Sequence, residues 1–116
     1  MSTTKEILDH HLASFGKGDL DGILFDYAPD AVLFAPQGTL KGKDAMKPLF
    51  VSMFAEFAKP GASFALKHES IVGDYAYIIW NAESADNVYE GMSDLFVLRD
   101  GRIIAHAFGG KITAKT

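Results

Sequence analysis

The spacing of apolar residues changes once along this chain, from helical before residue 60 to strand-like after it. Within residues 46–57 the apolar side chains recur at i, i+3, i+4, i+7, i+8 and i+11, the pattern of one helix face. Pro48 lies inside this pattern and predicts a kink or a later start of the helix. Residues 63–112 are rich in strand-forming segments separated by short turns. Helices followed by strands predict an α+β protein.

A first helix is predicted near the N-terminus. Thr3 and Glu6 have the spacing of a capping box, in which each side chain binds a backbone amide of the other residue. An apolar helix face follows over residues 7–15, and Gly16 and Gly18 are expected to end the helix.

The next segment is predicted to be short and irregular. Asp19 can cap a second helix over residues 20–25. Residues 27–30 are expected to form a turn, because their proline has a fixed φ and biases the preceding residue away from helix. A short strand over 31–35 and a glycine-rich connection over 37–42 follow.

Four strands and two tight turns are predicted for the C-terminal half. Gly73-Asp74 and Asp100-Gly101 have the composition of two-residue hairpin turns. The strands are expected at residues 63–72, 74–83, 88–99 and 102–112.

One of these strands must be covered on both faces. Its residues 75–80 are large and apolar at both parities, whereas a strand in a one-sided sheet alternates apolar with polar residues. The predicted helices can cover one face. A second copy of the chain is the simplest cover for the other, which predicts a homodimer through the sheet.

Composition limits the function classes. A length of 116 residues fits one domain, residues 1–116. The hydrophobic fraction of 48%, with nine Phe, predicts apolar surface beyond a core, either a ligand cavity or a subunit interface. The absence of cysteine excludes disulfides and thiolate metal sites.

Charge and hydropathy narrow the expected partners and location. The net charge is −4 without any cluster of Lys and Arg, so we expect no nucleic-acid partner and no binding to an anionic membrane. No apolar run approaches the length of about 18 residues that a membrane span needs. A cytoplasmic protein is the expectation.

Five short motifs follow one another along nearly the whole chain in an order that resembles the SnoaL-like branch of the nuclear transport factor 2-like superfamily. They are GDLDGI at 18–23, YAPDAV at 27–32, GTLKGKDA at 38–45, GDYA at 73–76 and SDLFVLRDGRI at 93–103. The resemblance implies three N-terminal helices packed on a strongly curved antiparallel sheet, a cystatin-like cone that encloses an apolar pocket. It also implies dimerisation through the sheet. The superfamily includes ketosteroid isomerases, polyketide cyclases, scytalone dehydratase, limonene epoxide hydrolase and non-catalytic binders, so fold alone does not decide function.

The resemblance also implies positions for catalytic groups. Ketosteroid isomerases place an Asp base before a Pro at the end of the first strand, where this chain has Ala35. Their second acid matches Asp94, and their oxyanion-binding Tyr matches His11 in register. The acid that cyclases carry after the last strand is replaced here by Gly109 and Gly110. Steroid-type isomerisation is therefore not expected.

Three residues remain as candidate catalytic groups. Asp94 lies in a strand that must be largely buried, and burial of a carboxyl suits a general acid. His11 lies in the middle of the apolar face of the first helix, whereas His10 is about 100° further round and should be solvated. His106 is expected to share a strand face with neighbours two residues away.

Each candidate also has a structural interpretation. His11 can be a core histidine paired with a carbonyl or a Tyr hydroxyl, and Asp94 can hold a loop. His106 and the looser candidate His68 can be edge or interface residues. No histidine pair has i, i+4 spacing and no phosphate-binding or dinucleotide motif is present, so we expect neither a metal nor a cofactor.

Two functions remain open at this stage. The first is a pocket for a small apolar molecule, with isomerase, cyclase or dehydratase chemistry on a carbonyl compound. The second is a non-catalytic ligand-binding or dimeric interaction domain of the same fold. The residues expected to line the pocket are Leu12, Phe15, Leu33, Ala35, Phe50, Phe54, Tyr77, Ile79, Asn81 and Phe108.

Overall fold

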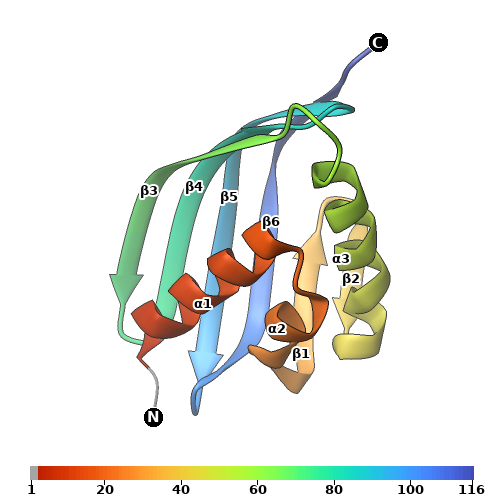
Figure 1. Cartoon of the computed structure of the whole chain (residues 1–116). Coiled ribbons are helices and arrows are strands. Elements are labelled where there is room, and N and C mark those ends of the chain that lie inside the picture. The colour runs from red at the N-terminus through yellow and green to blue at the C-terminus, as the bar shows by residue number, and fades with distance from the viewer. Residues whose placement is uncertain (1–2) are drawn as a thin grey trace.

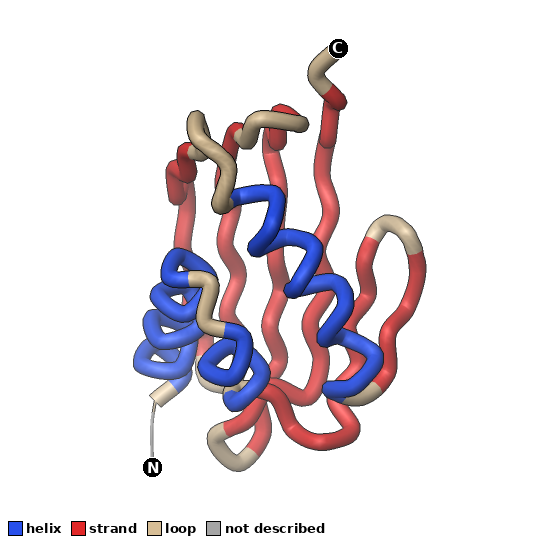
Figure 2. The backbone as a smooth tube through the Cα atoms, turned by 45° about the vertical axis from the view of Figure 1, so that its right-hand side comes forward, coloured by secondary structure: helices blue, strands red, loops and turns tan. Residues whose placement is uncertain are grey.

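Three helices lie on one face of a curved six-stranded sheet in the computed structural model, which describes residues 3–116 (Figure 1, Figure 2). The helices are α1 (Thr4–Lys17), α2 (Leu20–Phe25) and α3 (Lys43–Phe57). The strands are β1 (Tyr27–Ala35), β2 (Gly38–Lys41), β3 (Ser63–Val72), β4 (Tyr75–Glu83), β5 (Asn87–Arg99) and β6 (Arg102–Ala114). This architecture confirms the predicted α+β class with helices packed on one sheet. No helix within the described residues is long and apolar enough to cross a membrane.

The sheet is mixed, whereas an antiparallel one was expected. Its order is β2-β1-β6-β5-β4-β3, and β1 pairs with β6 in parallel while the other neighbours are antiparallel. The β1–β2 hairpin lies early in the sequence and adds to the free edge of the last strand, β6. Because β1 is the strand that pairs with β6 and runs in the same direction, this pair is parallel. This places the N-terminal and C-terminal halves of the chain side by side at β1 and β6 (Figure 1).

The predicted helix caps and hairpin turns are confirmed. The Thr3 Oγ1 accepts from the Glu6 amide and the Glu6 carboxylate accepts from the Thr3 amide, which is the capping box of α1. Gly18 ends this helix in the left-handed conformation, with φ 66°. Asp100 and Gly101 both have positive φ, as a type I′ hairpin turn requires.

Two segments predicted as irregular belong to the sheet. The predicted turn at residues 27–30 is wrong, because β1 begins at Tyr27 and runs through them. Proline is tolerated there since the pairing of β1 with β6 is interrupted between Tyr27 and Val32, so no backbone donor is missed. The connection at 37–42 contains β2, which forms a hairpin with β1 through Ala35 and Gly38.

The helix around Pro48 does not start late. It begins at Lys43 and includes Pro48 in its sixth position. Pro48 lies on the exposed face, where the missing backbone bond removes no buried contact. Met46 and Phe50 on the opposite face are buried against the sheet and hold the segment helical.

The faces of β4 differ sharply in burial. Ala76, Ile78 and Trp80 are buried under the helices. The residues of the other parity point to the face that no helix covers, and Tyr75 and Tyr77 are 56% and 37% exposed. The apolar residues on this second face of β4 are therefore exposed in the single chain. That a second copy of the chain covers them stays a prediction.

Candidate functional site

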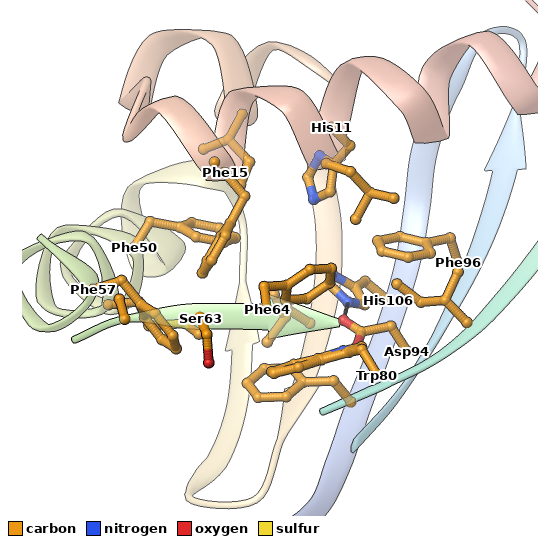
Figure 3. Close-up of a pocket in the computed structure, with 18 residues that line it drawn as sticks. His11, Phe15, Phe50, Phe57, Ser63, Phe64, Trp80, Asp94, Phe96 and His106 are labelled. Atoms are coloured by element: carbon orange, nitrogen blue, oxygen red, sulfur yellow. Dashed lines mark hydrogen bonds and ion pairs between the residues drawn. The ribbon is translucent and has the colours of Figure 1, made fainter. Parts of the chain in front are cut away.

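An apolar cavity of about 290 Å³ lies between α1, α3 and the helix-covered face of the sheet (Figure 3). Most of its lining is aliphatic or aromatic, and its polar side chains are His11, Ser63, Trp80, Asp94 and His106. Since a water molecule occupies about 30 Å³ in the liquid, a ligand of about ten non-hydrogen atoms would fill it.

The exposed residues in the cavity lining come from two segments of the chain and mark its opening. Gly16, Ala62, Ser63 and Phe64, from the end of α1 and the start of β3, are exposed and line the cavity. The opposite end is formed by buried residues, which include His11, Ile23, Leu33, Ile78 and His106. A ligand would therefore enter beside β3 and meet the polar side chains at the closed end.

The Asp94–His106 pair forms the polar part of the cavity wall. Asp94 lies on β5 and His106 on β6, and the distance from Asp94 Oδ2 to His106 Nε2 is 2.6 Å. The Trp80 Nε1–H donates to the other carboxyl oxygen, Asp94 Oδ1, at 2.5 Å. The side chains of Asp94 and His106 are only 11% and 5% exposed. Figure 3 shows these three side chains grouped at one side of the cavity.

Further hydrogen bonds continue from His106 through Tyr27 to His11, which also lines the cavity, and then to Asp26 and His10. The Tyr27 hydroxyl contacts His106 Nδ1 at 2.8 Å and His11 Nε2 at 3.3 Å. His11 Nδ1 lies 3.0 Å from Asp26 Oδ2. The same carboxylate binds His10 Nδ1, at 2.8 Å through Oδ1 and 3.0 Å through Oδ2. The resulting network, in order from the cavity, is Trp80, Asp94, His106, Tyr27, His11, Asp26 and His10.

Burial sets the protonation of the middle of this network. It lowers the pKa of His11, although the hydrogen bond to Asp26 opposes this, and positive charge on His106 lowers it further. His11 is therefore neutral at pH 7. Burial also raises the pKa of Tyr27 well above its ordinary value of 10.0, so its hydroxyl keeps its proton.

These states fix the direction of each hydrogen bond. Neutral His11 donates from Nδ1 to the Asp26 carboxylate, so its Nε2 accepts from the Tyr27 hydroxyl. The Tyr27 oxygen then accepts from His106 Nδ1–H. One more proton lies between His106 Nε2 and Asp94 Oδ2, because two lone pairs do not face each other at 2.6 Å. The pair is either an imidazolium with a carboxylate or an imidazole with a carboxylic acid, and both forms hold a proton at the cavity wall.

Lowering the pH should destabilise the fold through His11. Because the folded pKa of His11 lies below its ordinary value of 6.5, the unfolded chain binds more protons as the pH falls through that value. The contribution of His11 to stability is complete above pH 6.5 and is lost as the pH falls toward the folded pKa. Urea unfolding at pH 7.5 and 5.5 should show a larger loss for the wild type than for His11→Gln, which does not titrate. Equal losses in the two proteins would contradict the neutral state of His11.

The three candidate catalytic residues lie close together. Asp94 and His106 are in direct contact, and the rings of His11 and His106 are 6.1 Å apart between centroids. His11 also has the Tyr hydroxyl partner that its structural interpretation required. His10, expected to be solvated, is half-exposed but bound to Asp26. No group of three or more His, Cys, Asp and Glu side chains within residues 3–116 is arranged as a metal site.

Of the ten residues expected to line the pocket, five line the cavity and five do not. Those that line the cavity are Leu12, Phe15, Leu33, Phe50 and Phe108. The other five lie elsewhere, namely Ala35, Phe54, Tyr77, Ile79 and Asn81.

The misplaced residues have physical explanations. Ala35 and Tyr77 line a shallow depression on the uncovered face of the sheet, and Ile79 shares the parity of Tyr77. Both parities of β4 are apolar, so the sequence does not distinguish its two faces. The Asn81 side chain instead accepts from the Gly91 amide at 2.8 Å, and Phe54 packs against the core beside Phe50.

The expected alternation on the last strand is also interrupted. His106 and Ile103 are both buried, although three positions apart, while Ile104 lies in a different depression near Arg99. The register of β5 with β6 shifts between Val97 and Leu98, and this bulge moves Ile104 away from the His106 face. His68 is exposed on β3 and packs near Tyr77 on the uncovered side.

Three residues of the network were missed by sequence reasoning. Asp26 follows the predicted second helix, Tyr27 begins the predicted turn, and Trp80 belongs to the strand segment that was predicted to be covered on both faces. No usable sequence signal pointed to Asp26 and Tyr27, because the pair His10-His11 that they contact lies 15–16 residues earlier in the chain. The contact between Tyr27 and His106 joins residues 79 positions apart, which no local pattern predicts.

Comparison with known proteins places the chain in a family. The model of the SnoaL-like domain matches residues 8–106 of the chain. The chain belongs to the SnoaL-like family. The match includes His10, His11, Asp26, Tyr27, Asp94 and His106, so the whole network lies inside the SnoaL-like domain.

Solved structures show the same NTF2-like fold at low sequence identity. The SnoaL-like chain is similar to the epoxide hydrolase/cyclase-like enzyme SalBIII, which has a role in pyran ring formation in the polyether salinomycin. The TM-score is 0.80 at 18% identity, over 97% of this chain and 95% of that one. It is also similar to TerC co-crystallised with polyporic acid, with TM-score 0.75 and 19% identity over 95% and 92% of the two chains.

A third similar structure is an NTF2-like protein of unknown function from Cytophaga hutchinsonii. Its TM-score is 0.76 at 12% identity, over 96% of this chain and 92% of that one. No curated protein matches the SnoaL-like chain in sequence. These similarities establish the fold, and the activity must be argued from the site.

Proposed function

We propose that this chain binds a small apolar carbonyl compound in the cavity and acts on it by general acid–base chemistry of the isomerase, cyclase or dehydratase type. The observation that carries the proposal is the contact of 2.6 Å between Asp94 Oδ2 and His106 Nε2, two buried side chains that line an apolar cavity. Ligand sites of this kind combine a mostly apolar lining with a few polar groups that fix orientation.

The geometry supports proton donation to a ligand oxygen. An oxygen that reaches the pair accepts the proton shared by His106 Nε2 and Asp94 Oδ2, which leaves a carboxylate and a neutral imidazole. The Trp80 Nε1–H already donates to Asp94 Oδ1 and stabilises that carboxylate. The apolar surroundings exclude water and strengthen both interactions.

A second candidate is a non-catalytic ligand-binding domain. Within residues 3–116 every buried side-chain nitrogen and oxygen has a hydrogen-bond partner, so the network is complete without a ligand. A fully hydrogen-bonded network of this kind also has a purely structural role, because it rigidifies the core and specifies one arrangement of it. The two functions differ in one step. An enzyme transfers the proton of the Asp94–His106 pair to its ligand, and a binding domain does not.

A ligand screen followed by one conservative variant separates the candidates. Thermal unfolding is measured at fixed protein concentration with small ketones, enones, lactones and phenols, where a ligand at 100 times its Kd adds about 2.7 kcal/mol. Compounds that stabilise the protein are then assayed for turnover. Asp94→Asn should keep binding within severalfold and lower turnover by about 10²–10⁴-fold.

The control for this variant is Glu90→Gln, which removes a carboxylate from an exposed position on the same strand. It should change neither binding nor turnover. Binding without turnover in the wild type would favour the second candidate, and a flat response across the screen would contradict both.

We infer that a second copy of the chain covers the free face of the sheet. Phe34, Tyr77 and Leu95 line one depression on this face and are 50%, 37% and 41% exposed. Large apolar side chains gathered on one face of a soluble domain are typical of an interface between subunits.

Leu95→Lys should therefore shift the protein from dimer to monomer in light scattering after size-exclusion chromatography, because the lysine would place a charge in the centre of this face. Val51→Lys, on the exposed side of α3, is the matched control and should leave the mass unchanged. A wild type that stays monomeric at high concentration would contradict the dimer.

A further inference from the structure

The aromatic side chains of the chain are concentrated around the cavity. Six of the nine Phe and the single Trp line it. They come from the two longer helices, α1 and α3, and from all four strands of the C-terminal half, β3 to β6. A molecule in the cavity therefore meets aromatic rings on more than one side.

These rings form two walls. On the helix side, Phe15 and Phe57 meet edge to face, with 5.7 Å between their ring centroids. On the strand side, the rings of Phe64 and Trp80 lie 5.3 Å apart and are tilted by 33°. Figure 3 shows the first pair beside the helices and the second pair on the strands. A flat ring between the walls gains edge and face contacts with aromatic rings, which a saturated ring of the same size does not gain.

The cavity has no net charge that would attract a charged ligand. Among its lining residues, all of which lie within the described part of the chain, none is Lys or Arg. The Asp94–His106 pair is neutral as a whole in either of its two forms. An ionised ligand would lose its hydration on entry without meeting a partner of opposite net charge. The lining therefore favours an uncharged molecule.

The polar groups of the lining provide for one ligand oxygen. Trp80 Nε1–H is bonded to Asp94, and both ring nitrogens of His11 have partners in the protein. Ser63 lies at the exposed opening. The proton between Asp94 and His106 is therefore the one that a ligand can reach inside the cavity, and a second buried oxygen on the ligand would stay unpaired.

We propose that the cavity selects an uncharged, flat molecule with one aromatic ring and one carbonyl group on that ring, which is an aryl ketone or an aryl aldehyde. The ring lies between the two aromatic walls, and the carbonyl oxygen accepts the proton between Asp94 and His106. One ring with a short carbonyl substituent has about ten non-hydrogen atoms, the number that fits the cavity. This inference rests on the proposed function for the ligand site and the carbonyl group, and it narrows the ligand to one class.

The class is tested with three probes that have the same number of non-hydrogen atoms, namely acetophenone, cyclohexyl methyl ketone and benzoate. Their Kd values are measured by isothermal titration calorimetry at pH 7.5. Acetophenone should bind about tenfold more tightly than cyclohexyl methyl ketone, because its ring contacts both aromatic walls. Benzoate should bind at least about 100-fold more weakly than acetophenone, because its charge has no counter-ion. A fourth probe, 2-acetylnaphthalene, has a second fused ring and should bind no more tightly than acetophenone.

The place of binding is read from Trp80. Since the chain has a single Trp, its one indole N–H signal in an NMR spectrum reports on the neighbour of Asp94. Acetophenone should shift this signal, and titration of the shift should give the Kd found by calorimetry. Binding that leaves the Trp80 signal unchanged would place the ligand elsewhere and overturn the proposal.

A matched pair of variants tests the aromatic wall. Phe15→Leu keeps an apolar side chain in the cavity lining but removes one ring, so the ratio of the two ketone Kd values should fall by about threefold or more. Phe25→Leu makes the same exchange at an exposed position outside the cavity and should leave the ratio unchanged. Because the ratio is taken within each variant, a general change in stability or affinity cancels.

Equal affinities for the two ketones would overturn the aryl class and leave the proposed function intact, since both probes are apolar carbonyl compounds. Benzoate bound as tightly as acetophenone would overturn the selection for an uncharged ligand, and tighter binding of 2-acetylnaphthalene would contradict the limit to one ring. Selective binding of acetophenone by a protein that turns over no carbonyl compound would refute the proposed chemistry and leave the ligand class intact. Binding of neither ketone would contradict both.

Discussion

Replacing Asp94 by Leu should lower the free energy of unfolding by about 3–5 kcal/mol, because it removes one partner of a buried, hydrogen-bonded Asp–His pair. The substitution leaves the Trp80 Nε1–H and His106 Nε2 without partners in an apolar environment. For a domain of this size each kcal/mol corresponds to about 4 °C in Tm, so the loss is easily seen in thermal or urea unfolding.

Asp94→Asn is the matched variant for this measurement. The amide oxygen can accept from Trp80 and the amide nitrogen can donate to a neutral His106, so both neighbours remain paired. We expect a loss of about 1 kcal/mol, in the range of a single exchanged hydrogen bond. Equal losses for Leu and Asn would show that the carboxyl contacts contribute little, which contradicts the description of the pair as a satisfied buried dyad.

Replacing Phe50 by Ala should have a comparable effect by a different route. Phe50 is 4% exposed, lines the cavity and contacts the rings of His11 and Tyr27. Truncation of a buried Phe costs about 3–5 kcal/mol through lost apolar burial and the space that remains. It also enlarges a cavity that should then bind bulkier ligands than the wild type does.

The control for Phe50 is Val51→Ala on the same helix, where the side chain is half-exposed. Its effect should stay within about 0.5 kcal/mol. A similar loss in both variants would mean that helix propensity, rather than packing around the cavity, determines the stability of α3.

Much of the fold follows from local patterns. The capping box at Thr3, the left-handed Gly18 and the Asp100-Gly101 turn each depend on residues adjacent in sequence, and each was predicted. The clear apolar spacing of the third helix was also sufficient, although Pro48 disturbed its predicted start. These features could be read because the interactions that determine them are local.

The errors occurred where distant parts of the chain decide the structure. Pro29 is typical of a turn, but it lies inside β1. It is tolerated there because the pairing of β1 with β6 is interrupted between Tyr27 and Val32. The bulge near Ile104 arises from the pairing of two strands, and it changes which side chains share a face with His106.

The candidate site was only partly accessible from the sequence. Asp94, His11 and His106 could be named because each lies among apolar residues, where a titratable group is unusual. Their connection through Tyr27 and Asp26 depends on tertiary contacts between α1, β1 and β6, so their roles could not be derived before the structure.

The number of protons on His106 is the most direct test of the site described here. In protein labelled with ¹⁵N-histidine at neutral pH, His106 should show a proton on Nδ1 and a second, strongly downfield proton between Nε2 and the Asp94 carboxyl group that disappears in Asp94→Asn. His11 should show one proton, on Nδ1. A neutral His106 protonated only at Nε2 would mean that the pair holds no proton beyond that of an ordinary neutral imidazole, and this result would contradict the proposed acid.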